Sequence, residues 1–131
     1  MNRSMIDFAE TDYKLIQHIK DVAGMEDPAI VNCQQCAEKY LKHLVREHLG
    51  EVVRSHSISA MISQLGDKFP DLLEYKKIAR FLTDSYYDRR YESEDYVMLE
   101  PEEYKDYLEQ SLELIEALRK ICGVADHKET K

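Results

Sequence analysis

Apolar residues recur at steps of three and four along almost the whole chain, which is the spacing of one face of an α-helix. The clearest stripe lies in residues 29–49 and consists of Ile30, Cys33, Ala37, Tyr40, Leu41, Leu44 and His48. Similar spacing predicts helices over 4–23, 57–65, 70–86 and 101–122. Four Gly and three Pro leave little material for the many tight turns of a β-fold. The sequence therefore predicts an all-α fold, an antiparallel up-and-down bundle of four to five helices.

Residues that typically begin or end helices lie at the borders of these segments. Ser57 is suited to cap the helix that follows it, and Gly50 to end the long helix before it. Pro101 is suited to a first helical turn. The pattern predicts one domain over residues 1–123 and a frayed tail over 124–131.

The charge and the cysteines limit the class of protein. With 18 basic and 26 acidic residues the net charge is −8, which argues against unspecific coating of nucleic acid and against double-stranded DNA as a ligand. No segment reaches the roughly 18 uncharged apolar residues that a membrane span needs. The N-terminus has no signal-peptide pattern, and Cys33, Cys36 and Cys122 are an odd number. We therefore expect reduced thiols and a cytoplasmic protein.

Cys33 and Cys36 form a CxxC pair, which is half of a common zinc-binding pattern. A structural zinc needs two further ligands, and neither Cys122 nor the scattered histidines offers the required spacing. A thioredoxin-like role would need a βαβ context, which is missing. Because Cys33 lies on the apolar stripe, we expect it to pack in the core, and we expect no metal.

Basic residues form a second stripe beside the apolar face of residues 29–49. They fall at steps of three and four: Lys39, Lys42, His43 and Arg46, with Arg54 and His56 just beyond the helix. One interpretation is an edge that faces the phosphates of a nucleotide or RNA. The other, which is the commoner, is a solvated helix face.

The segment DSYYDRRYESEDY, residues 84–96, crowds five acids, two arginines and four tyrosines into 13 residues. It lies outside the apolar period, and from residue 88 to residue 99 we expect a loop or a partly extended connection. Arginine recognises phosphate through planar, bidentate hydrogen bonds, and tyrosine rings stack on bases. An ion-pair hub of purely structural importance is the alternative, and the segment alone leaves both open.

Four pieces in order carry a resemblance to a known family. CQQCAEKYLKHLV, from Cys33, is followed by RSHSISAMISQL, by LTDSYYDRRYESEDY and by EEYKDYLEQSLELIEAL. Together they resemble HEPN domains, over about residues 5–121. In this resemblance Glu38 and Lys39 correspond to the Glu-Lys pair of the family's second helix, and His56 to its His position.

The resemblance implies a helical bundle that pairs as a homodimer, with a composite cleft at the interface. Many HEPN proteins are metal-independent ribonucleases, and many partner a small nucleotidyltransferase-fold protein in toxin–antitoxin or defence systems. Others bind nucleotides or act as scaffolds. The nuclease members use an Arg followed four to six residues later by His. Here the corresponding positions hold Glu94, Asp95, Tyr96 and Val97, so the nuclease motif is degenerate.

The resemblance therefore favours a nucleotide- or RNA-binding module that works with a nucleotidyltransferase-type partner and needs no cofactor. Arg90 and Tyr91 would hold a phosphate and a base. The basic side of the cleft would be lined by Lys39, Lys42 and His56, with Glu38 fixing the geometry of the cations.

Two alternatives of other classes stay open. In the first, the chain is a metal-independent endoribonuclease in which Arg89 and Arg90 hold the phosphate and Glu94 replaces the family's His. In the second, it is a purely structural dimeric scaffold. The spacing from Arg89 to Tyr96 also resembles the Arg-x4-His-x-Tyr form of toxin members, in which the partner transferase modifies the tyrosine.

Overall fold

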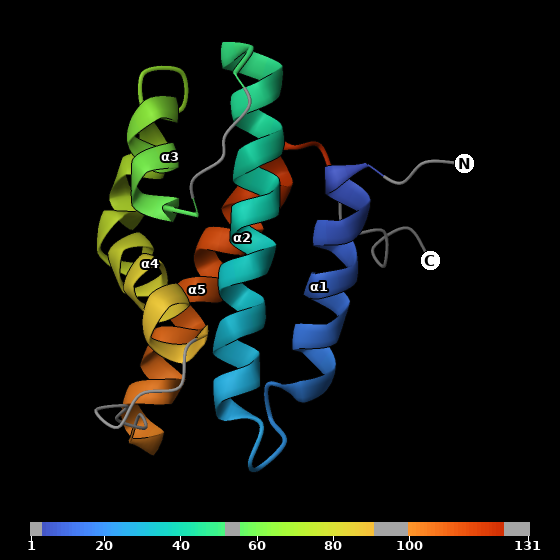
Figure 1. The fold of residues 1–131 in the computed structure, drawn as a ribbon, viewed down its shortest axis with the longest axis vertical. Helices are drawn as coiled ribbons and strands as arrows, with labels where there is room; N and C mark the ends of the chain where they lie inside the picture. Colours follow the sequence, from blue (N-terminus) through green and yellow to red (C-terminus); the bar gives the residue numbers. More distant parts are fainter. Residues whose placement is uncertain (1–3, 52–55, 91–99, 125–131) are drawn as a thin grey trace.

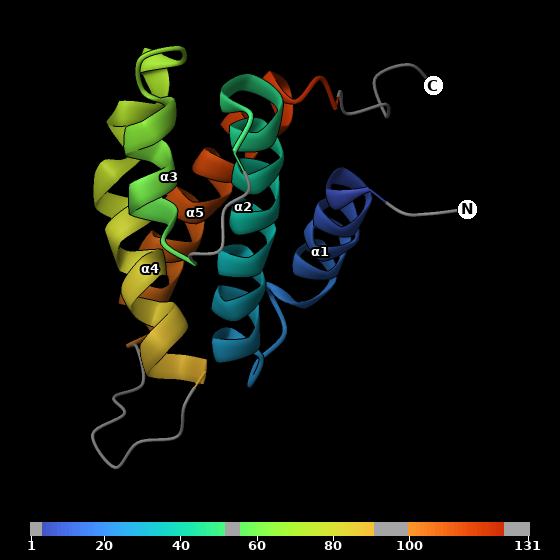
Figure 2. The same cartoon turned by 45° about the horizontal axis from the view of Figure 1, so that its top comes forward.

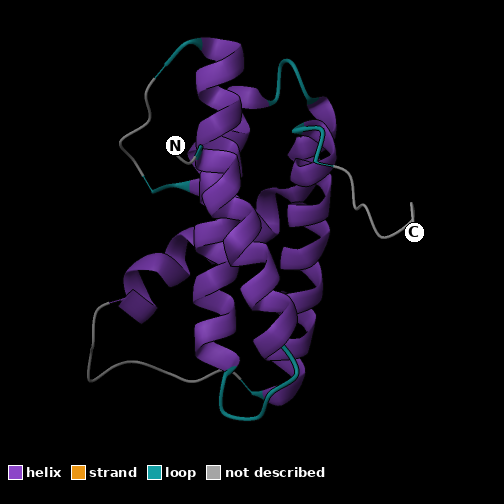
Figure 3. Cartoon of the chain, turned by 90° about the vertical axis from the view of Figure 1, so that its right-hand side faces the viewer, coloured by secondary structure: helices purple, strands orange, loops and turns teal. Residues whose placement is uncertain are grey.

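The structure is a computed structural model that describes residues 4–51, 56–90 and 100–124, with side chains described except at 85–90. These residues form five α-helices and one 3₁₀ helix and contain no strand (Figure 3). The elements are α1 (Met5–Ile19), α2 (Glu26–Leu49), α3 (Ile58–Leu65), η1 (Pro70–Tyr75), α4 (Lys76–Arg90) and α5 (Pro101–Ile121). The predicted all-α fold is confirmed.

The long helix α2 is the centre of the bundle, and it contacts each of the other four α-helices. In Figure 1, α1 lies on one side of α2, α3 and α4 lie on the other, and α5 runs behind it. The four longer helices alternate in direction, and the short α3 lies beside α4. Figure 2 shows the same arrangement from above, with α1 on the side of α2 that faces away from α3 and α4.

One apolar core joins all of these helices. The stripe predicted on α2 supplies its middle, because Ile30, Cys33, Tyr40 and Leu41 are fully buried. The other helices add the buried residues Ala9, Ile16, Ile58, Met61, Ile62, Leu65, Leu72, Ala79, Leu82, Leu114, Ile115 and Leu118. Neighbouring helices cover this stripe from both sides. Their packing decides which polar residues of α2 lie near the surface.

The helix ends follow the local sequence. Ser57 caps α3 by accepting a hydrogen bond from the backbone N–H of Ala60 (3.1 Å). Gly50 ends α2 in the left-handed region (φ 68°), which a residue with a side chain rarely adopts. Pro101 begins α5, and the side chain of Glu103 in its first turn accepts a hydrogen bond from the backbone N–H of Glu100 just before the helix (3.0 Å). These three boundaries confirm the sequence analysis.

Three expectations were wrong. The helix predicted over 4–23 ends at Ile19, and turns follow at residues 20–24. The loop predicted over 88–99 is still helical at residues 88–90, because a helix is propagated by backbone hydrogen bonds and these three residues include neither Gly nor Pro. The rest of that segment, residues 91–99, lies outside the described residues. His48, predicted on the core stripe, is exposed and meets the ring of Phe69 edge-on, with centroids 4.9 Å apart. The last turn of α2 thus lies beyond the core.

Candidate functional site

Glu38 lies in the middle of α2 and is 8% exposed, although it carries a charge. Gln34, one turn earlier, donates a hydrogen bond from Nε2 to Oε1 of Glu38 (2.7 Å). Lys42, one turn later, places Nζ 2.8 Å from Oε2. His56, from the connection between α2 and α3, places Nδ1 2.8 Å from the same oxygen. The carboxylate therefore binds a cation and an imidazole on one oxygen, and we call these four residues the Glu38 cluster.

The electrostatics of the cluster favour the ionised carboxylate. Burial alone would raise the pKa of Glu38, but hydrogen bonds from Lys42 and His56 outweigh it and hold the pKa below its ordinary value. Because an ionised carboxylate only accepts hydrogen bonds, the ring nitrogen Nδ1 of His56 is the donor in this contact. Lys42 has three N–H donors and uses one of them on Glu38, so the ammonium keeps capacity for an anion.

Thr83 of α4 fixes the beginning of α3 beside this cluster. Its hydroxyl donates to the carbonyl of Ala79 (2.8 Å) and accepts from the backbone N–H of Ser59 (3.1 Å). Ser59 lies in the first turn of α3, so its backbone N–H has no hydrogen-bond partner within that helix. Thr83 thus joins α4 to the segment that carries His56.

The structure brings two of the three predicted basic residues together and separates the third. Lys42 and His56 both bind Glu38. Lys39 instead points to α1, where its Nζ lies 2.5 Å from a carboxylate oxygen of Asp12. The expected grouping of Lys39 with the other two is therefore not observed.

The remaining predicted site residues lie at the end of α4 or beyond it. Arg89 and Arg90 form part of the last turn of α4, and their side chains are not described. Tyr91, Glu94 and Tyr96 lie outside the described residues. Along the helix axis, Arg90 is seven residues past Thr83, which corresponds to about 10 Å.

Cys33 and Cys36 belong to the core. Both are fully buried, and Cys36 donates a hydrogen bond from Sγ to the carbonyl of Ala9 (3.4 Å). Burial raises the pKa of Cys33 to about 12, and it also raises the pKa of Cys36. The packing role expected for Cys33 is confirmed. In the described ranges, no group of three or more His, Cys, Asp or Glu side chains is arranged to hold a metal ion.

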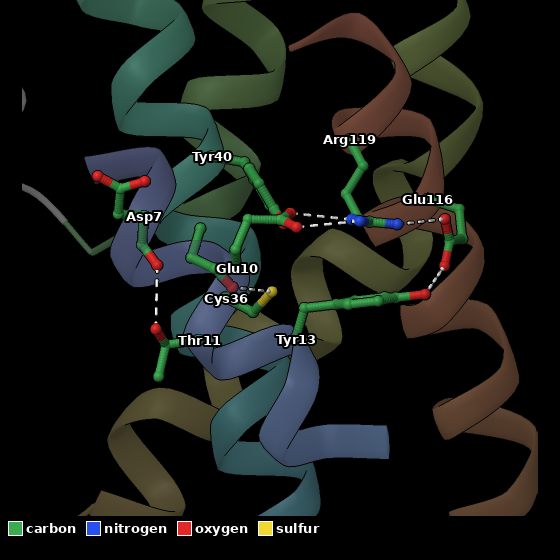
Figure 4. A network of polar contacts seen from close by, with 9 residues as sticks. Asp7, Glu10, Thr11, Tyr13, Cys36, Tyr40, Glu116 and Arg119 are labelled. Atoms are coloured by element: carbon green, nitrogen blue, oxygen red, sulfur yellow. Dashed lines mark hydrogen bonds and ion pairs between the residues drawn. The ribbon is translucent and has the colours of Figure 1, made fainter. Parts of the chain in front are cut away.

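A second polar network, which the sequence analysis missed, joins α1, α2 and α5 (Figure 4). Arg119 of α5 is 5% exposed and binds both carboxylate oxygens of Glu10 on α1, at 2.9 and 3.0 Å. The Tyr40 hydroxyl donates to the same carboxylate. The guanidinium also lies 4.0 Å above the ring of Tyr13, whose hydroxyl donates to Glu116. We call these five residues the Arg119 network.

The Arg119 network links α1 and α5 through side chains, since these helices make no close backbone contact among the described residues. A second link is the Tyr104 hydroxyl of α5, which donates to the carbonyl of Lys20 at the end of α1 (2.8 Å). Burial alone would raise the pKa of Glu10, but Arg119 and Tyr40 hold it below its ordinary value. A signal was present in the sequence: Arg119 falls at a core step between Ile115 and Cys122. A charge at such a position needs a buried partner.

The sequence model of the HEPN domain family matches residues 3–121 of the 131-residue chain. The chain belongs to the HEPN family. The match covers all five α-helices, and the resemblance noted in the sequence is thereby confirmed. Neither a curated protein nor a solved structure matches the chain significantly.

Membership in this family gives the broad class of function. A HEPN domain is a nucleotide- or RNA-related module, and HEPN domains commonly dimerise. No helix in the described residues is long and apolar enough to cross a membrane. The Glu38 cluster lies on the two segments that carried the resemblance, CQQCAEKYLKHLV and RSHSISAMISQL.

Proposed function

We propose that this HEPN domain binds a nucleotide or single-stranded RNA and works with a nucleotidyltransferase-type partner, without cleaving the RNA. The observation that carries the proposal is the Glu38 cluster, in which one buried carboxylate orients Lys42 and His56. A buried Glu with two such partners positions donors of hydrogen bonds at a surface of the bundle. Donors of this kind are suited to phosphate oxygens.

The second part of the binding surface is the end of α4. Arg90 supplies a guanidinium that suits a phosphate, and Tyr91 follows it with a ring that suits a base. Support comes from Thr83, which joins α4 to the start of α3, the helix that follows His56.

The proposal excludes cleavage on chemical grounds. Metal-independent cleavage of RNA needs a group that manages the proton of the 2′-hydroxyl and a cation that holds the phosphate. Arg89 or Arg90 is suited to the second task. Glu94 stands where the family's nuclease members have His, and a carboxylate there repels the scissile phosphate.

Equilibrium binding tests this proposal directly. Fluorescence anisotropy of a labelled single-stranded RNA should give a Kd for the full chain, and ATP should compete for the same site. Arg90→Ala and Lys42→Met should each weaken binding about tenfold, because each removes a charge-assisted hydrogen bond to phosphate. Arg80→Ala is the matched control, since Arg80 is an exposed arginine on the same helix. If Arg90→Ala bound RNA as tightly as the Arg80→Ala control, Arg90 would not belong to the binding surface and its assignment would be wrong.

A further inference from the structure

A groove of about 1030 Å³ lies between α5 and the segment formed by η1 and α4. Its floor is apolar and comes from both sides. Tyr75 of η1 faces it from one side, and Leu112, Ala117 and Ile121 of α5 face it from the other. These four side chains are partly exposed, so they offer contact area to a ligand. An apolar strip of this kind is what the apolar face of an amphipathic helix covers.

Acidic residues line both edges of the groove. Glu109, Glu113 and Glu116 follow one another at steps of four and three, and therefore form one edge along α5. Asp71 and Glu74 form the other edge on η1. Two lysines, Lys77 and Lys120, also line the groove, so that its charge is −3.

Most of this negative charge is not compensated within the chain. Asp71, Glu74, Glu109 and Glu113 are all exposed, and within the described part of the chain none of them forms an ion pair. Glu116 differs, because it belongs to the Arg119 network. Unpaired acids on both sides of an apolar floor attract a ligand that combines apolar and cationic groups.

We propose that this groove docks a basic amphipathic helix of a partner protein. The apolar face of that helix lies on the floor, and its Lys and Arg side chains reach the acids on both edges. The α5 side of the groove, from Glu109 to Ile121, extends over about 18 Å, which matches a helix of about 12 residues. The groove is built by η1, α4 and α5 and shares no residue with the Glu38 cluster, so the inference does not depend on the proposed binding of RNA.

A second copy of the chain fits this groove less well than a basic partner. The chain has a net charge of −8. Its exposed apolar residues on the first half of α1, Met5 and Phe8, lie beside the exposed Asp7. Docking that face into the groove would bring another acid against the acids of the groove, which costs free energy.

A synthetic peptide tests the inference on the full chain. The probe is a labelled 12-residue amphipathic helix made of Leu and Lys, and the same peptide with Glu in place of Lys is the control ligand. The variant Glu109→Gln/Glu113→Gln removes two charges from the groove. The variant Glu47→Gln/Glu102→Gln removes two exposed charges elsewhere and is the matched control. We expect the groove variant to weaken binding of the Lys peptide about fivefold and the control variant less than about twofold.

Backbone amide shifts in ¹H–¹⁵N spectra locate the peptide. The inference predicts shifts concentrated in residues 71–78 and 109–121. Equal weakening by both variants, or shifts centred on other acidic residues, would show that the peptide merely follows the net charge and would overturn the inference. If Glu109→Gln/Glu113→Gln had a different oligomeric mass in solution from the wild type, a second copy of the chain would occupy the groove. That result would also overturn the inference.

Discussion

Glu38 shares its carboxylate between Lys42 and His56, and a Gln side chain of nearly the same shape lacks the charge that holds them. We expect Glu38→Gln to lower the free energy of unfolding by about 1–3 kcal/mol, because it leaves the two donors without their charged acceptor in a partly buried place. Urea unfolding at pH 7 measures this. The control Glu47→Gln, on the exposed side of α2, should change stability by less than about 0.5 kcal/mol. Equal effects of the two variants would contradict the importance of the cluster.

The pKa values of Glu10 and Glu38 predict how stability depends on pH. Both are held below the ordinary value of 4.5, so each carboxylate binds a proton less readily in the folded state than in the unfolded state. The stability that they contribute is therefore fully present above about pH 4.5 and is lost as the pH falls through the lower, folded values.

Urea unfolding of the wild type and of Glu10→Gln/Glu38→Gln between pH 3 and 7 tests this dependence. The difference in the free energy of unfolding should be constant above about pH 5 and should shrink below pH 4.5. A difference that stayed constant down to pH 3 would show that these carboxylates are not stabilised in their ionised form.

The contacts of the Glu38 cluster could be predicted from the sequence better than those of the Arg119 network. Glu38 and Lys42 are one helical turn apart, so helical spacing alone places them together. Arg119 and Glu10 are separated by 109 positions, and no local pattern relates them. Arg119 lies at an apolar step of α5, which indicated a buried charge. The residue that pairs with Arg119 depends on how α1 packs against α2, which the sequence does not show.

At the level of elements, Thr83 adds hydrogen bonds to the apolar packing between α3 and α4. Thr83→Val keeps the shape of the side chain but leaves the N–H of Ser59 without its acceptor. We expect a loss of about 1–2 kcal/mol in the free energy of unfolding and faster hydrogen exchange at the Ser59 amide. Thr83→Ser keeps the hydroxyl and should keep the protection of that amide. Equal protection in Thr83→Val would show that this hydrogen bond does not hold the start of α3.

Helices could be predicted from the sequence where an apolar stripe or a capping residue marks them, as Ser57 and Pro101 do for α3 and α5. The last turn of α4 could not, because residues 88–90 lack the apolar steps while their backbone continues the helix. His48 shows the opposite error. It continues the spacing of the α2 stripe beyond the point at which neighbouring helices cover it.

For the whole molecule, the distribution of charge matters more than its sum. The net charge of −8 argues against a broad surface for nucleic acid. Four acids without an ion pair among the described residues, Asp71, Glu74, Glu109 and Glu113, line the groove between α5 and the segment of η1 and α4, whereas Lys42, His56 and the two arginines in the last turn of α4 are not among its lining residues. An acidic chain of this design is able to offer one surface to RNA and another to a basic protein partner.

Incubation of end-labelled single-stranded RNA with the purified chain in EDTA, followed by native and denaturing gels, tests the proposed function most directly. Arg89→Ala/Arg90→Ala is run beside the wild type. We predict that the wild type retards the RNA on the native gel, that the variant does not, and that the RNA stays intact with both. Cleavage by the wild type that is lost in the variant would contradict the proposal and identify a ribonuclease in which a carboxylate replaces the family's His. RNA that is neither retarded nor cut would contradict it as well and leave the chain as a scaffold.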